Sequence, residues 1–452
     1  MRIAELAGQR VAIWGFGREG RAAIRALRKR IPELPLALYC GEKEVAQAQA
    51  FDAALRVYAH EPDAVALSAY DVIVKSPGIS AYKPAILTAQ AQGTRFTSGT
   101  ALWFAENPQA RVAAVTGTKG KSTTTALMAH LARSLGVRTA LAGNIGLPML
   151  ELLDQNADLW AIELSSFQTG EAGALELGVI TSLYEEHLDW HGSRERYVAD
   201  KLKLVDAAWQ LLVNAEQASL LEKTGAHTNR KLFGHVDGWH VAEGFIHRGE
   251  TKVFALDQLP VPGYHNALNA CAALAALELM GLDAVTAAPA LVGFRALPHR
   301  LQLLGERDGL QWINDSISTT PLATIAALDS LHGREVTVIV GGHDRGLDWS
   351  PFVQSVARRS ALRIVTQGAN GPRIAAVLRS AKSNIPLGDS DKLDDAIEMA
   401  RIVTPQGGVV LLSPGAPSFD QFHDYAERGR HFAETAGFDG NAMTGIDGLG
   451  IA

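Results

Sequence analysis

One repeated pattern restricts the fold of this 452-residue chain more than any other feature: a short aliphatic run, a glycine-rich turn, and an amphipathic stretch of Ala, Leu and Arg. A strand followed in this way by a helix pairs most readily in a parallel sheet, since the helix carries the chain back across one face. The pattern therefore predicts an α/β protein. Its aliphatic runs fall into three blocks, at residues 10–14, 36–40 and 71–75, then 111–116, 159–164 and 179–183, then 311–314, 335–340, 362–366 and 408–412.

Three blocks in a chain of this length indicate three domains, at roughly 150 residues each. We expect a Rossmann-like N-terminal domain over residues 1–106 and a central domain with a P-loop-type parallel sheet over residues 107–298. A second Rossmann-like domain is expected over residues 299–452. The glycine-rich tail, residues 438–452, is expected to be loose.

Charge and cysteine content exclude several classes of protein. The 42 Lys and Arg residues are outnumbered by 48 Asp and Glu residues, and a net charge of −6 argues against nucleic-acid binding, which needs a basic surface. The two cysteines, Cys40 and Cys271, are too few for a disulfide framework and lie outside any zinc-binding pattern. Charges in Met1–Arg10 and polar residues within the Ala/Leu-rich run 267–282 indicate neither a secretory signal nor a membrane span, so we expect a cytoplasmic protein without a membrane partner.

The strongest local motif is Thr116-Gly-Thr-Lys-Gly-Lys-Ser-Thr123, between a strand and a helix of the second block. Its small residues let the backbone curl, so that N–H groups and the helix N-terminus surround a polyphosphate. Lys121 would add a positive charge, and the Ser122 hydroxyl would reach Mg²⁺. Val115 stands where the general pattern has glycine, so the loop is a shorter variant. The nucleotide-binding candidates are Gly117, Thr118, Lys119, Gly120, Lys121, Ser122 and Thr123.

A second glycine motif, Gly15-Phe-Gly-Arg-Glu-Gly20, follows the first strand. With Glu42 at the end of the next strand, it is compatible with a nicotinamide dinucleotide. A better phosphate loop follows later in the chain, so the first motif is also compatible with another ligand. That ligand would be a nucleotide-linked substrate whose diphosphate is held at the helix N-terminus. The turn Ser76-Pro77-Gly78 ends a strand at the same sheet edge, where ligands of open α/β sheets bind, although it also fits an ordinary tight turn.

Two further residues point to metal chemistry. Glu163 ends an apolar strand, where a lone carboxylate needs a partner, and Mg²⁺ is a plausible one. His187 follows another strand and would reach the same sheet edge, although a lone histidine is usually structural. Lys201 lies on a helix, and its sequence surroundings do not distinguish it from a solvated lysine.

Taken in order, the motifs resemble those of the Mur ligases, the family that adds amino acids to the UDP-linked peptidoglycan precursor. The agreement covers nearly the whole chain, which makes it more specific than any single loop. Beside the phosphate loop, the matching motifs are Gly143-Asn-Ile-Gly146, Glu163-Leu-Ser-Ser-Phe-Gln168, His187, His265-Asn266-x-x-Asn269, His299-Arg300, Asn314-Asp-Ser316 and Leu411-Leu-Ser-Pro-Gly-Ala-Pro-Ser-Phe-Asp420.

The resemblance implies an N-terminal domain for the UDP moiety, a central ATPase domain, and a C-terminal domain that closes over both substrates. Residues assigned in this way to the UDP-linked substrate are Gly15, Phe16, Gly17, Arg18, Ser76, Pro77, Gly78 and Asn144. Those assigned to ATP contacts and closure are Asn266, Asn269, Arg300 and Asp315. Two Mg²⁺ sites are expected, supported by Ser122, Glu163, His187 and Lys201, the last matching a carbamylated lysine whose added carboxylate contacts magnesium.

The resemblance also implies a reaction. The alanine carboxylate of UDP-N-acetylmuramoyl-L-alanine attacks the γ-phosphate of ATP, giving ADP and an acyl phosphate, and the amine of glutamate then displaces phosphate. Neutralising charge during phosphoryl transfer is where a preorganised site helps most. The expected catalytic residues are Lys121, His187 and Lys201.

Binding of glutamate requires cations and hydroxyls for its two carboxylates. Matching positions in the C-terminal part are Thr319, Arg345, Ser418 and Tyr425. Ile317 and Arg345 stand where lysine is common in the D-glutamate-adding pattern, and Tyr425 replaces a frequent phenylalanine. A guanidinium is not equivalent to an ammonium, so the carboxylate sites would move. These residues resemble a less common subfamily that adds L-glutamate, whose product needs later epimerisation, and we favour L-glutamate over D-glutamate.

Other functions are compatible with parts of the sequence. Folylpolyglutamate synthetases share a similar phosphate loop, but they generally begin close to it, without the equivalent of residues 1–106. A dinucleotide-dependent oxidoreductase and a nucleotide-binding protein without turnover are further alternatives. The metal-ligand candidates argue against the last of these. A monomer is compatible with the sequence.

Overall fold

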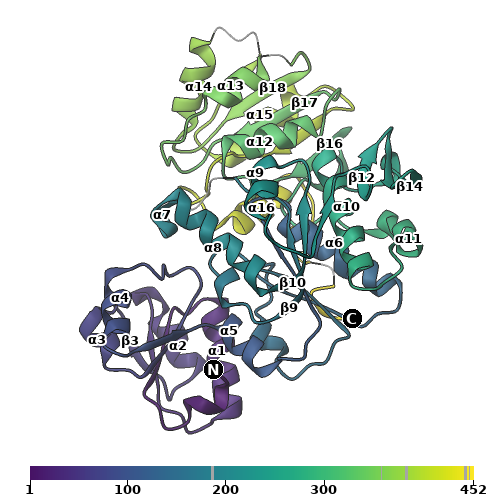
Figure 1. Cartoon of the computed structure of the whole chain (residues 1–452). Helices are drawn as coiled ribbons and strands as arrows, with labels where there is room; N and C mark the ends of the chain where they lie inside the picture. Colours follow the sequence, from purple (N-terminus) through teal and green to yellow (C-terminus); the bar gives the residue numbers. More distant parts are fainter. Residues whose placement is uncertain (185–187, 358, 382–384, 442–444, 447) are drawn as a thin grey trace. The chain divides into compact units, whose positions relative to one another are not determined.

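The computed structural model describes residues 1–184, 188–357, 359–381, 385–441, 445–446 and 448–452 (Figure 1). The chain divides into two compact units. The first contains Met1–Gln258, Ala267–Val292 and Gly448–Ala452. The second contains Leu259–Asn266 and Gly293–Asp447.

The first unit begins with a five-stranded parallel sheet. Its strands are β1 (Val11–Trp14), β2 (Leu36–Tyr39), β3 (Arg56–Tyr58), β4 (Val72–Lys75) and β5 (Arg95–Thr97). Its helices are η1 (Ile3–Leu6), α1 (Arg18–Arg30), η2 (Glu42–Glu44), α2 (Val45–Phe51), α3 (Ala64–Ser68), α4 (Pro84–Ala91) and α5 (Gly99–Glu106). The strand order is β3-β2-β1-β4-β5, which changes direction between β1 and β4. The carboxyl ends of β1 and β4 therefore border the crevice where such sheets bind ligands.

Helices cover both faces of this sheet, which explains why β1 and β4 are buried at every position. Apolar residues of α1, α2 and α5 pack on one face, and those of α3 and α4 pack on the other. Alternate strand residues serve the two faces: Ile13 faces the first set of helices, and Ala12 and Trp14 face the second.

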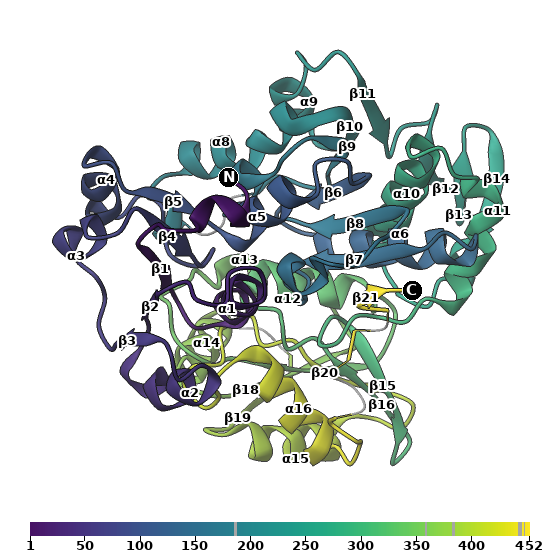
Figure 2. The same ribbon diagram turned by 90° about the horizontal axis from the view of Figure 1, so that it is seen from below.

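A seven-stranded sheet follows in the same unit. Its strands are β6 (Val112–Thr116), β7 (Thr139–Gly143), β8 (Leu159–Glu163), β9 (Leu175–Ile180), β10 (Ala208–Asn214), β11 (Arg230–Phe233) and β21 (Gly450–Ile451). The order is β11-β10-β9-β6-β8-β7-β21, with β21 antiparallel to β7 and the other pairs parallel (Figure 2). Strand β6 therefore lies in the middle of the sheet, and the loop that follows it is flanked on both sides.

Helices and a small antiparallel sheet complete this part of the chain. The helices are α6 (Lys121–Ser134), η3 (Met149–Leu152), η4 (Thr169–Glu171), α7 (Leu188–His191), α8 (Arg194–Ala207), α9 (Ala218–Lys223), η5 (Leu256–Gln258), α10 (Tyr264–Leu279), α11 (Ala284–Ala287) and η6 (Ala288–Gly293). The small sheet contains β12 (Trp239–Ala242), β13 (Phe245–Arg248) and β14 (Thr251–Ala255). Helix α6 packs over β6, β7 and β8, while α8 packs over β9 and β10.

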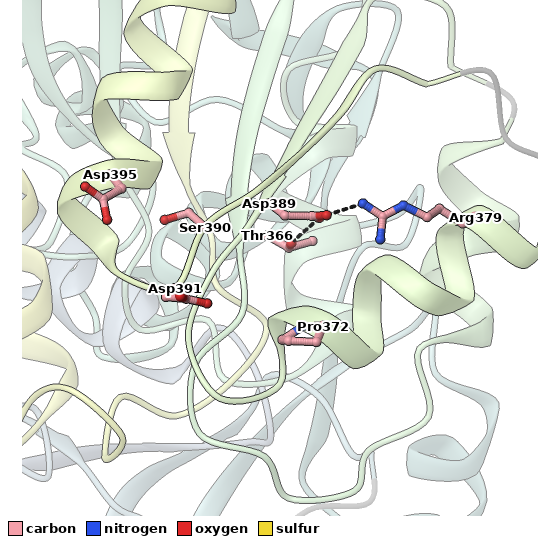
Figure 3. A pocket seen from close by; sticks show the side chains of 7 residues that line it. All are labelled: Thr366, Pro372, Arg379, Asp389, Ser390, Asp391 and Asp395. Carbon is pink, nitrogen blue, oxygen red and sulfur yellow. Dashed lines mark hydrogen bonds and ion pairs between the residues drawn. The ribbon is translucent and has the colours of Figure 1, made fainter.

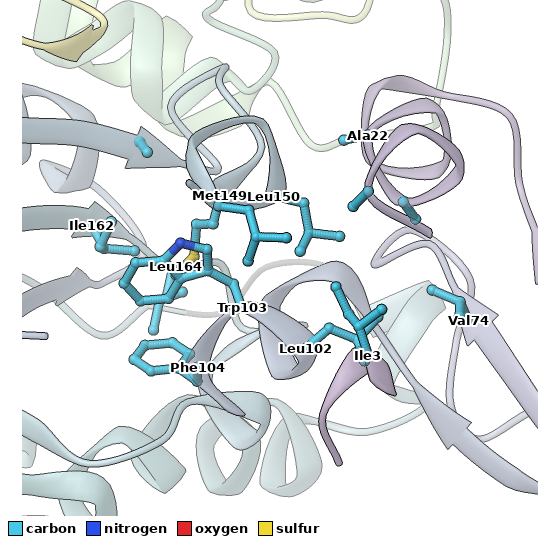
Figure 4. Close-up of a cluster of buried hydrophobic side chains, with 14 of the residues drawn as sticks. Ile3, Ala22, Val74, Leu102, Trp103, Phe104, Met149, Leu150, Ile162 and Leu164 are labelled. Carbon is cyan, nitrogen blue, oxygen red and sulfur yellow. The ribbon is translucent and has the colours of Figure 1, made fainter. Parts of the chain in front are cut away.

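The two sheets of the first unit share one hydrophobic core (Figure 4). Trp103 of α5 is fully buried, and its ring centroid lies 4.6 Å from that of Trp160 in β8. Leu102 and Leu150 belong to the same cluster. Because burying large aromatic rings is strongly favourable, this core holds the N-terminal sheet against the sheet that carries the phosphate loop.

The second unit contains a six-stranded sheet. Its strands are β15 (Gln302–Arg307), β16 (Leu310–Asn314), β17 (Val336–Val340), β18 (Leu362–Thr366), β19 (Leu387–Asp389) and β20 (Val409–Leu412), in the order β15-β16-β20-β17-β18-β19. Its helices are α12 (Pro321–Asp329), α13 (Ser350–Val356), α14 (Gly371–Ser380), α15 (Leu393–Val403) and α16 (Tyr425–Thr435). Helices α12, α13 and α14 pack on one face, and α15 and α16 on the other.

The predicted α/β class is confirmed: the first sheet is parallel throughout, and the two larger sheets are parallel except for the edge pairs β21–β7 and β15–β16. The predicted strand 179–183 is shifted, since β9 ends at Ile180. The expectation of a loose tail was wrong for its last residues, because β21 pairs with β7 and Ala452 exchanges backbone hydrogen bonds with Thr139. Among the described helices, none combines the length and apolar character needed to cross a membrane.

Candidate functional site

The loop between β6 and α6 has a conformation that requires glycine at two positions. Gly117 has φ +150° and Gly120 has φ +87°. A Cβ atom at Gly117 would collide with the Thr181 hydroxyl, and one at Gly120 would collide with Oδ1 of Asn269. Gly120 is the N-cap of α6, so the N–H groups of the first helical turn point out of the helix end. This is the geometry that binds phosphate.

Residues after the neighbouring strand β9 hold the loop from one side. Ser182 accepts a hydrogen bond from the Thr118 N–H at its carbonyl (2.9 Å) and one from the Lys119 N–H at its hydroxyl (2.7 Å). The Thr181 hydroxyl donates to the Lys119 carbonyl at 2.6 Å. Neither residue was predicted as part of the site, because both fall inside the predicted strand 179–183, whereas β9 ends at Ile180.

Lys201 lies directly against the phosphate loop. Its side chain is 2% exposed, and Nζ donates to the carbonyl oxygen of Gly117 at 3.0 Å. Tyr197, one turn earlier on α8, places its hydroxyl 2.7 Å from that of Thr118. Lys201 is therefore not a solvated lysine, and the structure resolves the alternative that the sequence left open. Lys121 also folds over the loop, with Nζ 3.1 Å from the Thr118 carbonyl.

Glu163 lies at the end of β8, next to β6 in the sheet. It is 1% exposed, and its Oε1 accepts a hydrogen bond from the side-chain amide of Asn144 at 2.8 Å. Its other oxygen, Oε2, is buried and has no hydrogen-bond partner among the described residues. A buried carboxylate oxygen without a donor is costly unless a cation occupies the space beside it.

The remaining metal and nucleotide candidates are distributed as follows. The Ser122 side chain is buried in the first turn of α6. Asn269 of α10 accepts a hydrogen bond from Thr124 at 3.4 Å, close to Gly120. His187 lies outside the described residues. Within those that are described, no group of three or more His, Cys, Asp and Glu is arranged to hold a metal ion.

The first glycine motif and the turn after β4 meet at the crevice of the N-terminal sheet. Gly15 has φ +101°, and a Cβ there would lie 2.6 Å from the Ser76 hydroxyl. The ring of Phe16 is buried, so a ligand would reach only its backbone. Arg18, exposed at the start of α1, donates to the carbonyl of Gly146 at 3.1 Å. The structure therefore brings Arg18 to the loop that carries Asn144.

The glutamate candidates of the second unit follow three strands that are neighbours in the sheet. Thr319 follows β16, Ser418 follows β20 and Arg345 follows β17. Ser418 is buried, whereas Arg345 is exposed. The Gly341 N–H donates to the Pro414 carbonyl at 2.8 Å, and the His343 N–H donates to the Pro417 carbonyl at 2.8 Å. These bonds tie the loop of Arg345 to the loop of Ser418.

Asp315 and Arg428 form the buried polar support beneath these loops. Asp315 accepts hydrogen bonds from the hydroxyls of Ser318 (2.5 Å) and Ser413 (2.8 Å) and from the Leu301 N–H (3.1 Å). Burial nevertheless raises the pKa of Asp315 to about 6. Arg428 donates to Ser316 and to the Ala416 carbonyl, and burial lowers its pKa to about 10.

Tyr425, the fourth glutamate candidate, begins α16 and is 38% exposed. Its ring packs edge-on against His299, with centroids 5.9 Å apart. Asn266 donates to the Pro262 carbonyl at 2.7 Å, also within the second unit. Asn266, Arg300, Asp315 and Tyr425 thus belong to that unit, whereas Asn269 belongs to the first.

A separate cavity of about 390 Å³ lies at the carboxyl ends of β18 and β19 (Figure 3). None of the glutamate candidates lines it. Asp389 forms an ion pair with Arg379 and accepts a hydrogen bond from the Thr366 hydroxyl at 3.0 Å. Asp391 and Asp395 add further acidic groups, so the lining does not suit a dicarboxylate.

Comparison with known proteins identifies the family. One family model, described as the Mur ligase middle domain, matches residues 115–277, and another, described as Mur ligase, glutamate ligase domain, matches residues 299–415. A protein from Xanthomonas euvesicatoria pv. vesicatoria, named UDP-N-acetylmuramoyl-L-alanine--L-glutamate ligase, is 52% identical over 468 aligned residues, which cover 100% of both chains. The chain belongs to the Mur ligase family. A protein of the same name from Micromonospora sp. is 38% identical over 451 residues, 96% of this chain and 98% of that one.

Solved structures of other Mur ligases have the same fold. UDP-N-acetylmuramate-alanine ligase from Thermotoga maritima aligns with a TM-score of 0.62 at 20% identity and covers 94% of this chain and 98% of that one. The MurF ligase from Thermotoga maritima, solved in complex with ADP, aligns with a TM-score of 0.59 at 16% identity and covers 94% and 93%. Mur ligases use ATP to form amide bonds, so the present chain is an ATP-dependent ligase. The alternative of a dinucleotide-dependent oxidoreductase was therefore wrong.

Proposed function

We propose that this Mur ligase adds L-glutamate to UDP-N-acetylmuramoyl-L-alanine, with ATP converted to ADP and phosphate. The observation that carries the proposal is the 52% identity with a relative of that name over the full length of both chains. The conformation of the phosphate loop supports an ATP-dependent reaction, with Lys201 hydrogen-bonded to the loop and Glu163 at the end of the neighbouring strand.

The carboxylate of the precursor is a poor acyl donor until its oxygen is converted into a better leaving group. Transfer of the γ-phosphoryl group of ATP makes that conversion, and phosphate then leaves when the glutamate amine attacks. Lys121, whose Nζ donates to the Thr118 carbonyl, and the N-terminus of α6 would neutralise the charge of the transferred group. The Asn144 side chain would orient the UDP-linked substrate beside Glu163.

Magnesium fits the residues that are present. Its preferred ligands are carboxylate oxygens, waters and substrate phosphates, and it seldom uses a cage made only of protein. Oε2 of Glu163, buried and without a donor among the described residues, is a suitable ligand, and Ser122 lies in the first turn of the adjacent helix. Bound there, the ion would screen charge on the phosphates. We propose that His187 and a carbamate on Lys201 complete the metal ligands.

L-glutamate is proposed over D-glutamate on the residues of the second unit. Arg345 and Ser418 are carried by loops that hydrogen-bond to each other, and Thr319 and Tyr425 are expected to complete the site. Ile317 supplies no cation where the D-glutamate pattern has lysine. A product ending in L-glutamate would need a later epimerisation of that residue.

We also propose which part of the chain binds each substrate. Residues 1–106 would bind the UDP moiety through Gly15–Arg18 and Ser76–Gly78, residues 107–298 would bind ATP, and residues 299–452 would bind glutamate. The crevice between β1 and β4 supports the first assignment. Asn266, Asn269, Arg300 and Asp315 are the further candidates for ATP contacts.

Phosphate release tests the proposal directly. The enzyme is incubated with ATP, Mg²⁺ and UDP-N-acetylmuramoyl-L-alanine, and L- and D-glutamate are compared. We expect release with L-glutamate, at least tenfold slower release with D-glutamate, and none with Lys121→Ala. Release with D-glutamate alone would reverse the assigned chirality, and no release with either amino acid would remove the proposed function.

A further inference from the structure

A buried polar network connects α8 to the turn that follows β4, and nothing in the proposed reaction uses it. At its centre is Asp200, which is 5% exposed. Its carboxylate accepts hydrogen bonds from the Tyr82 hydroxyl at 2.8 Å, from Nδ1 of His191 at 2.8 Å and from Nζ of Lys203 at 2.6 Å. The Asp200 carbonyl accepts a further bond from the Thr169 hydroxyl at 2.6 Å.

The same network reaches the turn that is proposed to bind the UDP-linked substrate. The Ser80 hydroxyl donates to the Trp190 carbonyl at 2.6 Å, and Nε1 of Trp190 donates to the Pro77 carbonyl at 3.2 Å. The Tyr82 ring packs edge-on against Trp190, with centroids 5.8 Å apart. Residues 77–82, which follow β4, therefore contact the segment from α7 to the middle of α8.

On the other side, the same helix touches the phosphate loop. Asp200 and Lys201 are consecutive, so their side chains leave α8 about 100° apart. One of them points at Tyr82, and the other places its Nζ atom 3.0 Å from the Gly117 carbonyl. A shift of α8 that followed the loss of the Asp200 contacts would move Lys201 away from Gly117.

We propose that Asp200 and Tyr82 are positioning residues that fix Lys201 against the phosphate loop and couple it to the turn at residues 76–80. His191, which is fully buried, anchors the same carboxylate through Nδ1, and its Nε2 lies 3.0 Å from the Ser166 hydroxyl. Neither Asp200 nor Tyr82 needs to touch a substrate for this role. Only the turnover test of this inference rests on the proposed function, since the other test needs no substrate.

Hydrogen exchange in the protein without ligands gives the first test. Tyr82→Phe removes one hydroxyl and keeps the ring, and Asp200→Asn removes the charge with little change in shape. We expect both to raise amide exchange in α8 and in residues 117–122 by about threefold or more, with β16 unchanged. The control Tyr70→Phe removes a hydroxyl from the same N-terminal sheet region and should leave residues 117–122 unchanged. Unchanged exchange at residues 117–122 in Tyr82→Phe would overturn the proposal.

Turnover gives the second test. We expect kcat to fall about tenfold in Asp200→Asn and about threefold in Tyr82→Phe, with the KM for glutamate unchanged. Because Asp200 acts through Lys201, the double variant Asp200→Asn/Lys201→Ala should be as active as Lys201→Ala alone. Losses that multiply in the double variant would contradict the proposal.

The two tests separate this inference from the proposed function. A wild-type enzyme without phosphate release would refute the function, and the exchange measurement would still decide whether Asp200 holds α8 against the loop. If Asp200→Asn does not fold, Tyr82→Phe, which leaves every charge in place, supplies both measurements.

Discussion

The side-chain amide of Asn144 donates a 2.8 Å hydrogen bond to Oε1 of Glu163, across the neighbouring strands β7 and β8. The bond uses one carboxylate oxygen and orients the other, which is buried and has no donor among the described residues. Gly143 makes the contact available, since a Cβ at this position would collide with the Glu163 carbonyl. A carboxylate held in this way is prepared for a cation.

Replacing that carboxylate by an amide should remove most of the activity. In Glu163→Gln the side chain keeps its shape but loses the charge that favours Mg²⁺ beside the phosphates. We expect kcat for phosphate release to fall by about a thousandfold, with a melting temperature no lower than that of the wild type. The half-buried Glu176, paired with Arg111 at 2.8 Å, provides the control Glu176→Gln, which should keep full activity. Equal activity of both variants would exclude a metal role for Glu163.

Gly120→Ala should weaken ATP binding through the phosphate loop. The φ of +87° is unfavourable for alanine, and the added Cβ would displace Asn269. We expect the Kd for ATP, measured by titration calorimetry, to rise about tenfold or more.

Gly136 offers a matched control for this substitution. It has φ +77°, and a Cβ added there would meet no atom within 4 Å among the described residues. Gly136→Ala should therefore introduce a backbone strain similar to that of Gly120→Ala and lower the melting temperature, but it should leave the Kd for ATP unchanged. The same Kd for ATP in both variants would show that the phosphate loop does not contribute to nucleotide binding.

Lys201→Ala should be weakly active and recover in part with short carboxylates. The structure buries Lys201 against Gly117, and alanine leaves a space in which formate or acetate can replace the carboxylate of a carbamate. We expect a rise of about fivefold or more in phosphate release at high acetate, with no effect of acetate on the wild type. Full activity of Lys201→Ala without added acid would show that no carbamate is required.

Asp315 should make stability depend on pH. Burial raises its pKa from 3.8 to about 6, so the folded state holds its proton more tightly than the unfolded state does. The stabilisation is complete below about pH 4 and is lost as the pH rises through about 6, a change of about 3 kcal/mol in the free energy of unfolding. Asp315→Asn cannot titrate, and urea unfolding between pH 4 and 7.5 should show its stability rising relative to the wild type over this range. Parallel curves for the two proteins would contradict the assignment.

Residues close together in the sequence explain most of what could be predicted. The phosphate loop, Glu163 at a strand end and the glycine motif after β1 are each defined by a few neighbouring residues, and parallel pairing then places them at common sheet edges. The sheet order adds what local patterns cannot contain, such as the adjacency of β16, β20 and β17 that groups Thr319, Ser418 and Arg345.

Features that depend on distant contacts were not predicted. Tyr82 and Asp200 are 118 residues apart, and a tyrosine and an aspartate carry no local signal of their pairing. Strand β21 has two residues, too few for a hydrophobic period, and it forms because the edge of β7 offers backbone partners. The residues around Lys201 have the pattern of a half-exposed helix, so its role was expected from the family resemblance and not from the local sequence.

Strand β21 also changes what happens when the chain is cut or extended. The polypeptide leaves the first unit after Gln258 and again after Val292, and it returns at Ala267 and at Gly448, so the chain passes between the two units four times. A single proteolytic nick at any one of these crossings therefore leaves the two units covalently linked through the others. Residues of an affinity tag attached directly after Ala452 would lie beside Thr139, to which the Ala452 backbone is hydrogen-bonded, whereas a tag placed before Met1 leaves that edge undisturbed.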